Sequence, residues 1–140
     1  MKALFQTLAL VLITGLGSAY AQNTHFVNGP TFTDNGSTYQ VCGKIAGLGN
    51  NQMAVITLTG TRTVTTQCTN KGGNIAPGQT KTENYQISGT FSSDQNGQIT
   101  FCLTSPAPTP GACPNGNWTG TVTDASFTNA KVLVNGNQIN

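Results

Sequence analysis

Five Asn-Gly dipeptides divide the chain after residue 21 into short segments. They stand at Asn28-Gly29, Asn35-Gly36, Asn96-Gly97, Asn115-Gly116 and Asn135-Gly136. Both residues tolerate positive φ, so this dipeptide fits the two central positions of a type I′ turn and is typical of β-hairpins between alternating segments. No stretch after residue 21 shows an apolar period of 3.6 residues with helix caps. The sequence therefore predicts an all-β fold.

The segments between the turn signals are rich in threonine, whose branched Cβ favours extended backbone. They predict strands near residues 24–28, 30–34, 37–45, 53–59, 60–68, 82–91, 98–104, 117–124 and 126–134. Two longer irregular segments, 71–81 and 105–117, contain Gly and Pro and are expected to be surface loops, because proline cannot donate to a central β-ladder.

Alternation gives most strands one apolar face. Examples are Val41 and Ile45 on one strand, and Ile99, Phe101 and Leu103 on another. Further apolar faces are expected from Tyr39, Tyr85, Ile87, Phe91, Trp118, Val122, Val132 and Val134. Such faces can be buried only against a second sheet. We expect a disulfide-linked, two-sheet β-sandwich of about seven to nine short strands with an immunoglobulin-like arrangement; a small barrel is the alternative.

The first 21 residues are typical of a signal peptide. Lys2 precedes an apolar run over residues 3–17, and small residues at Ala19 and Ala21 form a cleavage site before Gln22. The apolar run is shorter than the roughly 20 residues that a spanning helix needs, and no charged residues follow it directly. The prediction is one secreted domain, residues 22–140, in the extracellular space or on the cell surface.

Charge is sparse and not clustered. The formal net charge is +2, and only 7% of residues are charged. This pattern provides no electrostatic surface for nucleic acid or for anionic membrane. We therefore expect neither as a partner.

Cys42, Cys68, Cys102 and Cys113 allow three disulfide pairings. Cys42 and Cys102 both lie on the polar faces of their strands, and Cys68 and Cys113 each border one of the irregular segments. The strand pattern therefore favours Cys42–Cys102 with Cys68–Cys113. A metal site is not expected, because no CxxC pair is present and the single histidine is distant in the sequence.

Few residues could support catalysis. The candidates are His25, Asp34, Glu83, Asp94 and Asp124. His25 is expected on an edge strand near the mature N-terminus, Asp34 and Asp94 in turns, and Glu83 at the start of a strand. Asp124 is expected on the inward face with Trp118 and Val122, where a link between Lys44 and an asparagine is a remote alternative. No cofactor motif is present, so the chain is not expected to be an enzyme.

Four motifs occur together in one order: 43–50 (GKIAGLGN), 68–79 (CTNKGGNIAPGQ), 113–119 (CPNGNWT) and 122–128 (VTDASFT). In this respect residues 41–134 resemble an uncharacterised group of small secreted proteins, mostly bacterial. The resemblance implies export, a compact β-domain and a Cys68–Cys113 disulfide. It implies no activity and no ligand.

Two functions remain as hypotheses. The first is a structural or adhesive component of the cell surface or extracellular matrix, which associates with itself through edge strands at 23–32 and 130–140. The second is a module that binds carbohydrate or a surface through Phe26, Phe32 or Trp118, with extracellular glycans as partners. The Asn35 and Asn117 sequons would matter only in a host that glycosylates asparagine.

Overall fold

The computed structural model describes residues 24–140, which form two β-sheets and contain no helix. The predicted signal peptide lies outside this range. The strands are β1 His25–Asp34, β2 Tyr39–Ala46, β3 Met53–Asn70, β4 Ile75–Pro77, β5 Lys81–Ser92, β6 Ile99–Thr104, β7 Trp118–Val134 and β8 Asn137–Gln138. The predicted all-β, two-sheet architecture is confirmed.

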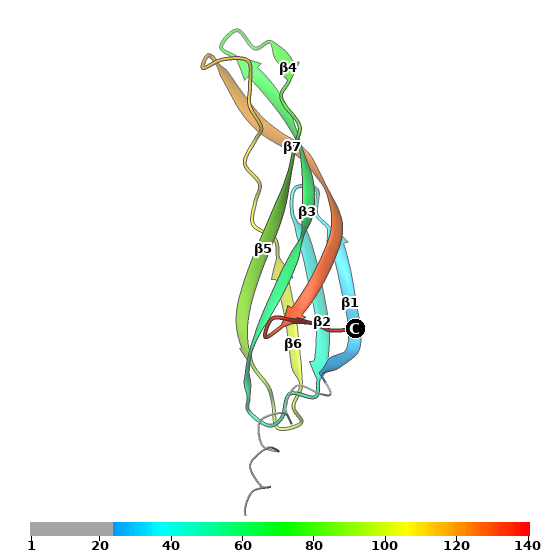
Figure 1. Ribbon diagram of the computed structural model, residues 1–140. Helices are drawn as coiled ribbons and strands as arrows, with labels where there is room; N and C mark the ends of the chain where they lie inside the picture. The colour runs from blue at the N-terminus through cyan, green and yellow to red at the C-terminus, as the bar shows by residue number, and fades with distance from the viewer. Residues whose placement is uncertain (1–23) are drawn as a thin grey trace, which may run out of the picture.

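The smaller sheet has the order β1-β2-β6, and the larger has the order β4-β3-β7-β8, with β5 also paired to β3. All the pairings are antiparallel. The molecule is elongated, and the smaller sheet lies against the lower part of the larger one (Figure 1). The end of β3, the start of β7 and β4 extend beyond it as a tip. The immunoglobulin-like strand order stays a prediction.

The Asn-Gly dipeptides differ in their roles. Asn135 and Gly136 have φ values of 51° and 86° and connect β7 to β8, as expected of a type I′ hairpin. Asn35-Gly36 lies in the turn between β1 and β2. Asn28-Gly29 was wrongly predicted as a turn: it lies inside β1, where the pairing with β2 shifts register. Gly29 has a φ of 84°, so it forms an irregularity within one strand rather than a hairpin.

The strands β3 and β7 are much longer than predicted, with 18 and 17 residues. Breaks were expected near Gly60 and Ala125, but both strands continue through these positions. A Cβ at Gly60 would collide with the ring of Tyr85, its partner on β5. Gly60 is thus required by the close approach of an aromatic ring, which a strand glycine often marks.

The core lies between the two sheets, and it confirms most of the predicted apolar faces. Val41 and Ile45 of the smaller sheet and Ile56 and Leu58 of the larger are fully buried. Other buried members are Leu48, Ala54, Tyr85, Ile99, Phe101, Leu103, Val132 and Val134. Because β3 buries its even-numbered residues, its odd-numbered residues lie on the outer face of the larger sheet.

The proline-rich segment 105–117 leaves the end of β6 and runs along the larger sheet to the tip (Figure 1). Its backbone is tied to that sheet and to the loop between β4 and β5: Gly111 N–H donates to Thr66 Oγ1 at 2.7 Å, and Gln79 N–H donates to the Ala112 carbonyl at 2.9 Å. The segment therefore covers the part of β3 that the smaller sheet does not reach. The predicted loop 71–81 also lies at the surface and includes the short strand β4.

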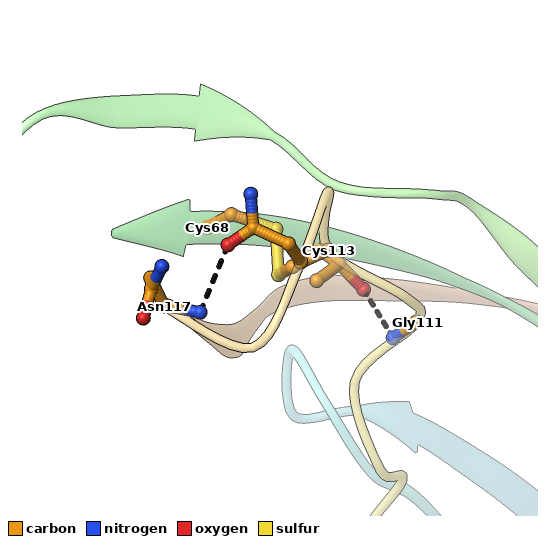
Figure 2. The surroundings of a disulfide bond; sticks show 6 residues. Cys68, Gly111, Cys113 and Asn117 are labelled. Carbon is orange, nitrogen blue, oxygen red and sulfur yellow. Dashed lines mark hydrogen bonds between the residues drawn. A yellow bond between two sulfur atoms is a disulfide. The ribbon is translucent and has the colours of Figure 1, made fainter. Parts of the chain in front are cut away.

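Both favoured disulfides are confirmed. Cys42 and Cys102 are direct cross-strand partners on β2 and β6, with Cα atoms 4.1 Å apart. The bond between Cys68 and Cys113 joins β3 to the proline-rich segment, with Cα atoms 5.9 Å apart (Figure 2). Cys68 is fully buried, whereas Cys102 is exposed.

Candidate functional site

One edge of β7 is open over much of its length. Along one edge β7 pairs with β3 from Trp118 to Val134. On its other side β8 pairs only with Leu133 and Val134, and Ala125 N–H donates to the Gly36 carbonyl at 3.0 Å. Within residues 24–140 no strand pairs with this side from Trp118 to Asp124. We call this segment, residues 118–124, the free edge of β7.

The edge formed by β1 is less regular. Its pairing with β2 shifts register on both sides of Asn28, and Pro30, which has no N–H group, follows. Bulges and proline are common protections of edge strands against pairing with another chain. At the other end of the chain, β8 covers the end of β7. The terminal segments proposed for self-association therefore lie at sheet edges, but both edges are partly protected.

Phe26 and Phe32 lie on β1 and line a groove of about 210 Å³ between β1 and the end of the chain. Ala130, Val132 and Ile139 contribute to its other side. Both phenylalanines are half-buried and pack against the core: Phe32 stacks on Tyr39 with ring centroids 5.5 Å apart. They are walls of a groove rather than an exposed stacking platform.

Trp118 begins β7 in the tip, opposite Asn70 of β3, and is half-buried. The tip extends beyond the smaller sheet, to which β1 belongs (Figure 1). The three aromatic residues expected to bind carbohydrate are therefore not brought together in one site.

Asp124 was predicted on the inward face, and this is wrong. Thr65 pairs with Asp124 while Thr66 pairs with Val122, so Thr123 is an extra residue in β7. Such a bulge inverts the alternation that follows. Asp124 is consequently exposed, and Ala125 is buried in its place. A carboxylate on the outer surface cannot assist a buried link involving Lys44.

The other carboxylates expected in turns are confirmed there. Asp34 Oδ1 accepts a hydrogen bond from Gly36 N–H at 2.9 Å. Asp94 Oδ1 accepts from the N–H groups of Asn96 and Gln98, both at 2.9 Å. Each carboxylate thus holds its own turn. His25 is exposed at the start of the edge strand β1, as expected.

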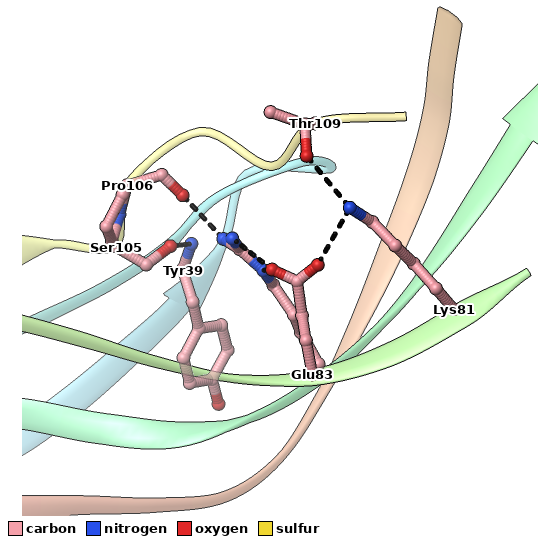
Figure 3. A network of polar contacts seen from close by, with 7 residues as sticks. Tyr39, Lys81, Glu83, Ser105, Pro106 and Thr109 are labelled. Atoms are coloured by element: carbon pink, nitrogen blue, oxygen red, sulfur yellow. Dashed lines mark hydrogen bonds and ion pairs between the residues drawn. The ribbon is translucent and has the colours of Figure 1, made fainter. Parts of the chain in front are cut away.

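A buried arginine forms the main charged network (Figure 3). The Arg62 side chain is 7% exposed, and its Nη2 lies 2.9 Å from Glu83 Oε2. Arg62 Nη1 donates to the Pro106 carbonyl at 2.6 Å, so the network ties the proline-rich segment to the sheet. Lys81 Nζ lies 3.1 Å from Glu83 Oε1 and donates to Thr109 Oγ1 at 2.8 Å. These hydrogen bonds, chiefly that from Arg62, hold the pKa of Glu83 below its ordinary value.

Tyr85 lies beside this network and is 4% exposed. The Arg62 guanidinium carbon is 5.8 Å from the centroid of the Tyr85 ring, a cation–π distance. Burial raises the pKa of the Tyr85 phenol. Its hydroxyl has no hydrogen-bond partner within residues 24–140. Sequence reasoning missed this arrangement. Arg62 is an even number of residues from Val64 and Cys68 in the same strand, and this alternation indicates that its side chain points inward.

Stability should decrease in acid partly through Glu83. A carboxyl group with a lowered folded-state pKa stabilises the fold above its unfolded pKa, and this contribution is lost as pH falls through the folded value. We expect wild-type melting temperature to fall more steeply below about pH 4.5 than that of Glu83→Gln. Asp124→Asn, which changes an exposed carboxylate, should keep the wild-type slope. Thermal unfolding between pH 2 and 7 measures this; equal slopes for Glu83→Gln and wild type would contradict it.

Within residues 24–140 no group of three or more His, Cys, Asp or Glu side chains could hold a metal ion. The same residues contain no helix that is long and apolar enough to cross a membrane. Comparisons with protein-family models, with curated proteins and with solved structures find no match to this chain.

Proposed function

We propose that this chain is a non-catalytic structural or adhesive protein of the cell surface or extracellular matrix, and that it associates with itself through the free edge of β7. The observation that carries the proposal is the open side of residues 118–124. An unpaired strand presents a row of backbone N–H and C=O groups, which a strand from another molecule can satisfy.

The chemistry of the free edge supports pairing with a second copy. Asp124 at its end is the only charged residue of the segment, and no proline interrupts it. The bulge at Thr123 is its one local irregularity, whereas β1 has two register shifts and Pro30. A low net charge also leaves little repulsion between copies. Two disulfides support an oxidising compartment such as the extracellular space.

The experiment uses mature protein, residues 22–140, in sedimentation velocity across a wide concentration range, with negative-stain imaging. Wild type should form dimers or larger assemblies as concentration rises. Thr119→Lys/Thr121→Lys should remain monomeric, because lysines on an edge strand oppose pairing with a copy that carries the same charges. Both threonines are exposed, so the fold should be retained.

A matched control places the same two lysines on β5, at the opposite edge of the larger sheet. Thr82 and Thr90 of β5 are also exposed, and β5 pairs only with β3. Thr82→Lys/Thr90→Lys should associate like wild type. Wild type that stays monomeric at every concentration would refute self-association. If only Thr82→Lys/Thr90→Lys prevented association, the interface would lie at β5 and not at the free edge of β7. Deleting residues 22–30 is a poor test, because it removes half of β1 and the core contact of Phe26.

A further inference from the structure

The outer face of the larger sheet is covered by small uncharged polar side chains. On β3 these are the odd-numbered residues from Thr57 to Thr69, which point away from the core, whereas Met53 and Val55 at the start of the strand are exposed and apolar. Their neighbours on β5 are also hydroxyl and amide side chains: Thr57 is opposite Ser88, Thr59 opposite Gln86, Thr61 opposite Asn84, and Thr63 opposite Thr82. Of the face's few charges, Lys131 lies opposite Thr59 and Asp124 opposite Thr65. This composition suits an uncharged partner rich in hydrogen-bonding groups.

A hollow of about 520 Å³ lies on this face. The hollow lies where β7 bulges: Thr59 pairs with Lys131 and Thr61 with Thr128, so two residues of β7 oppose Gly60. Asn129, one of these two, has a φ of 57°. The hollow is an open depression and not an enclosed cavity, so a ligand in it would keep one side exposed to solvent. Bulges often re-aim side chains in this way near functional sites.

Three amide side chains, on Asn84, Gln86 and Asn129, line the hollow, and all three residues are exposed. Asn84 Oδ1 accepts a hydrogen bond from Thr61 Oγ1 at 3.1 Å, which leaves its NH₂ group available to donate. An amide offers donors and an acceptor side by side, and two neighbouring hydroxyl groups of a sugar can both donate and accept. Lys131 adds further donors, and no acidic residue lines the hollow.

Tyr85 also borders the hollow, but its ring belongs to the core between the sheets and lies on the opposite face from Asn84 and Gln86. Its buried hydroxyl is therefore not accessible to a ligand on the outer face. The groups that can bind a ligand in the hollow are the exposed amides and Lys131.

We propose that this hollow binds one saccharide unit of an extracellular glycan through pairs of neighbouring hydroxyl groups. The site is separate from the free edge of β7, since none of residues 118–124 lines it. It also differs from aromatic stacking, because Phe26, Phe32 and Trp118 are absent from its lining.

The test is a nuclear magnetic resonance titration of ¹⁵N-labelled mature protein with cellohexaose, mannohexaose and an oligogalacturonide. At least one glycan should shift the side-chain NH₂ signals of Asn84, Gln86 and Asn129 saturably. Asn84→Ala/Gln86→Ala should weaken that binding by about tenfold or more, because it removes two amide contacts of about 1 kcal/mol each. Gln67→Ala removes an amide from the same face outside the hollow and should bind like wild type.

The probes distinguish two kinds of glycan, neutral ones and ones that also carry carboxylate groups. Binding of the neutral glycans that survives Lys131→Gln supports recognition by the amides alone. Preference for the oligogalacturonide that Lys131→Gln removes also supports the site and assigns the lysine to the carboxylate. Absence of saturable shifts at these amides with all three probes, or equal binding by Asn84→Ala/Gln86→Ala and wild type, overturns the proposal. Sedimentation of the same variants should be unchanged, so this failure is separable from failure of self-association.

Discussion

Replacing Cys68 and Cys113 together by alanine should lower the free energy of unfolding by about 4 kcal/mol. The bond links residues 45 positions apart, and its loss allows the unfolded chain many more conformations. Cys68 is also fully buried, so truncation leaves a small void under the proline-rich segment. Urea unfolding of both proteins measures the difference.

The same variant should release the segment from the tip. Without the disulfide, segment 105–117 keeps only its hydrogen bonds to the sheet, such as Gly111 N–H to Thr66 Oγ1. Limited proteolysis should therefore cut this segment in Cys68→Ala/Cys113→Ala. Cys42→Ala/Cys102→Ala is the control, because β2 and β6 remain joined by their ladder and the segment keeps its own disulfide. Equal protection of the segment in both variants would show that hydrogen bonds alone hold it.

The second large effect is expected from Arg62→Ala, with a loss of about 2–3 kcal/mol. Breaking a buried ion pair costs about 3–5 kcal/mol when the remaining charge is fully buried. The value here is reduced because the Glu83 side chain is 30% exposed and retains Lys81 as a partner. The substitution also leaves the Pro106 carbonyl without its donor and removes the cation–π contact with Tyr85.

Lys81→Ala is the matched control for Arg62→Ala. Both side chains contact Glu83, but the lysine is 33% exposed, and such a pair contributes roughly 0.5 kcal/mol. Chemical denaturation of the two variants under the same conditions makes the comparison. If Arg62→Ala lost no more stability than Lys81→Ala, the buried arginine would not be the main non-covalent tie between the sheet and the proline-rich segment.

Much of the fold follows from local chemistry. Alternation correctly assigned Val41, Ile45, Ile99, Phe101 and Leu103 to the core, because side chains of a strand have a period of two. The same alternation placed Cys42 and Cys102 on matching faces, and they are direct partners. Asn135-Gly136 formed the expected hairpin, since both residues accept positive φ.

The candidate sites were less accessible to such reasoning. Phe26 and Phe32 do line a groove, but their half-buried rings pack against the core, a role that a list of aromatic residues does not distinguish. The hollow is lined by Asn84 and Gln86 of β5 and by Asn129 of β7, two strands that both pair with β3, which lies between them. No motif of neighbouring residues could have indicated it.

The sequence by itself determined the all-β class, the pairing faces of the cysteines and the Asn135-Gly136 turn, because each depends on a few consecutive residues. Only the tertiary structure decided where strands bulge and which edges stay open. The bulge at Thr123 inverts the faces of Asp124 and Ala125, and the ring of Tyr85 occupies the space that a Cβ at Gly60 would need. Both features depend on the partner strand. One extra residue opposite a neighbouring strand reverses the period-two alternation of side chains, and the local sequence of a strand does not specify which strand will be its neighbour.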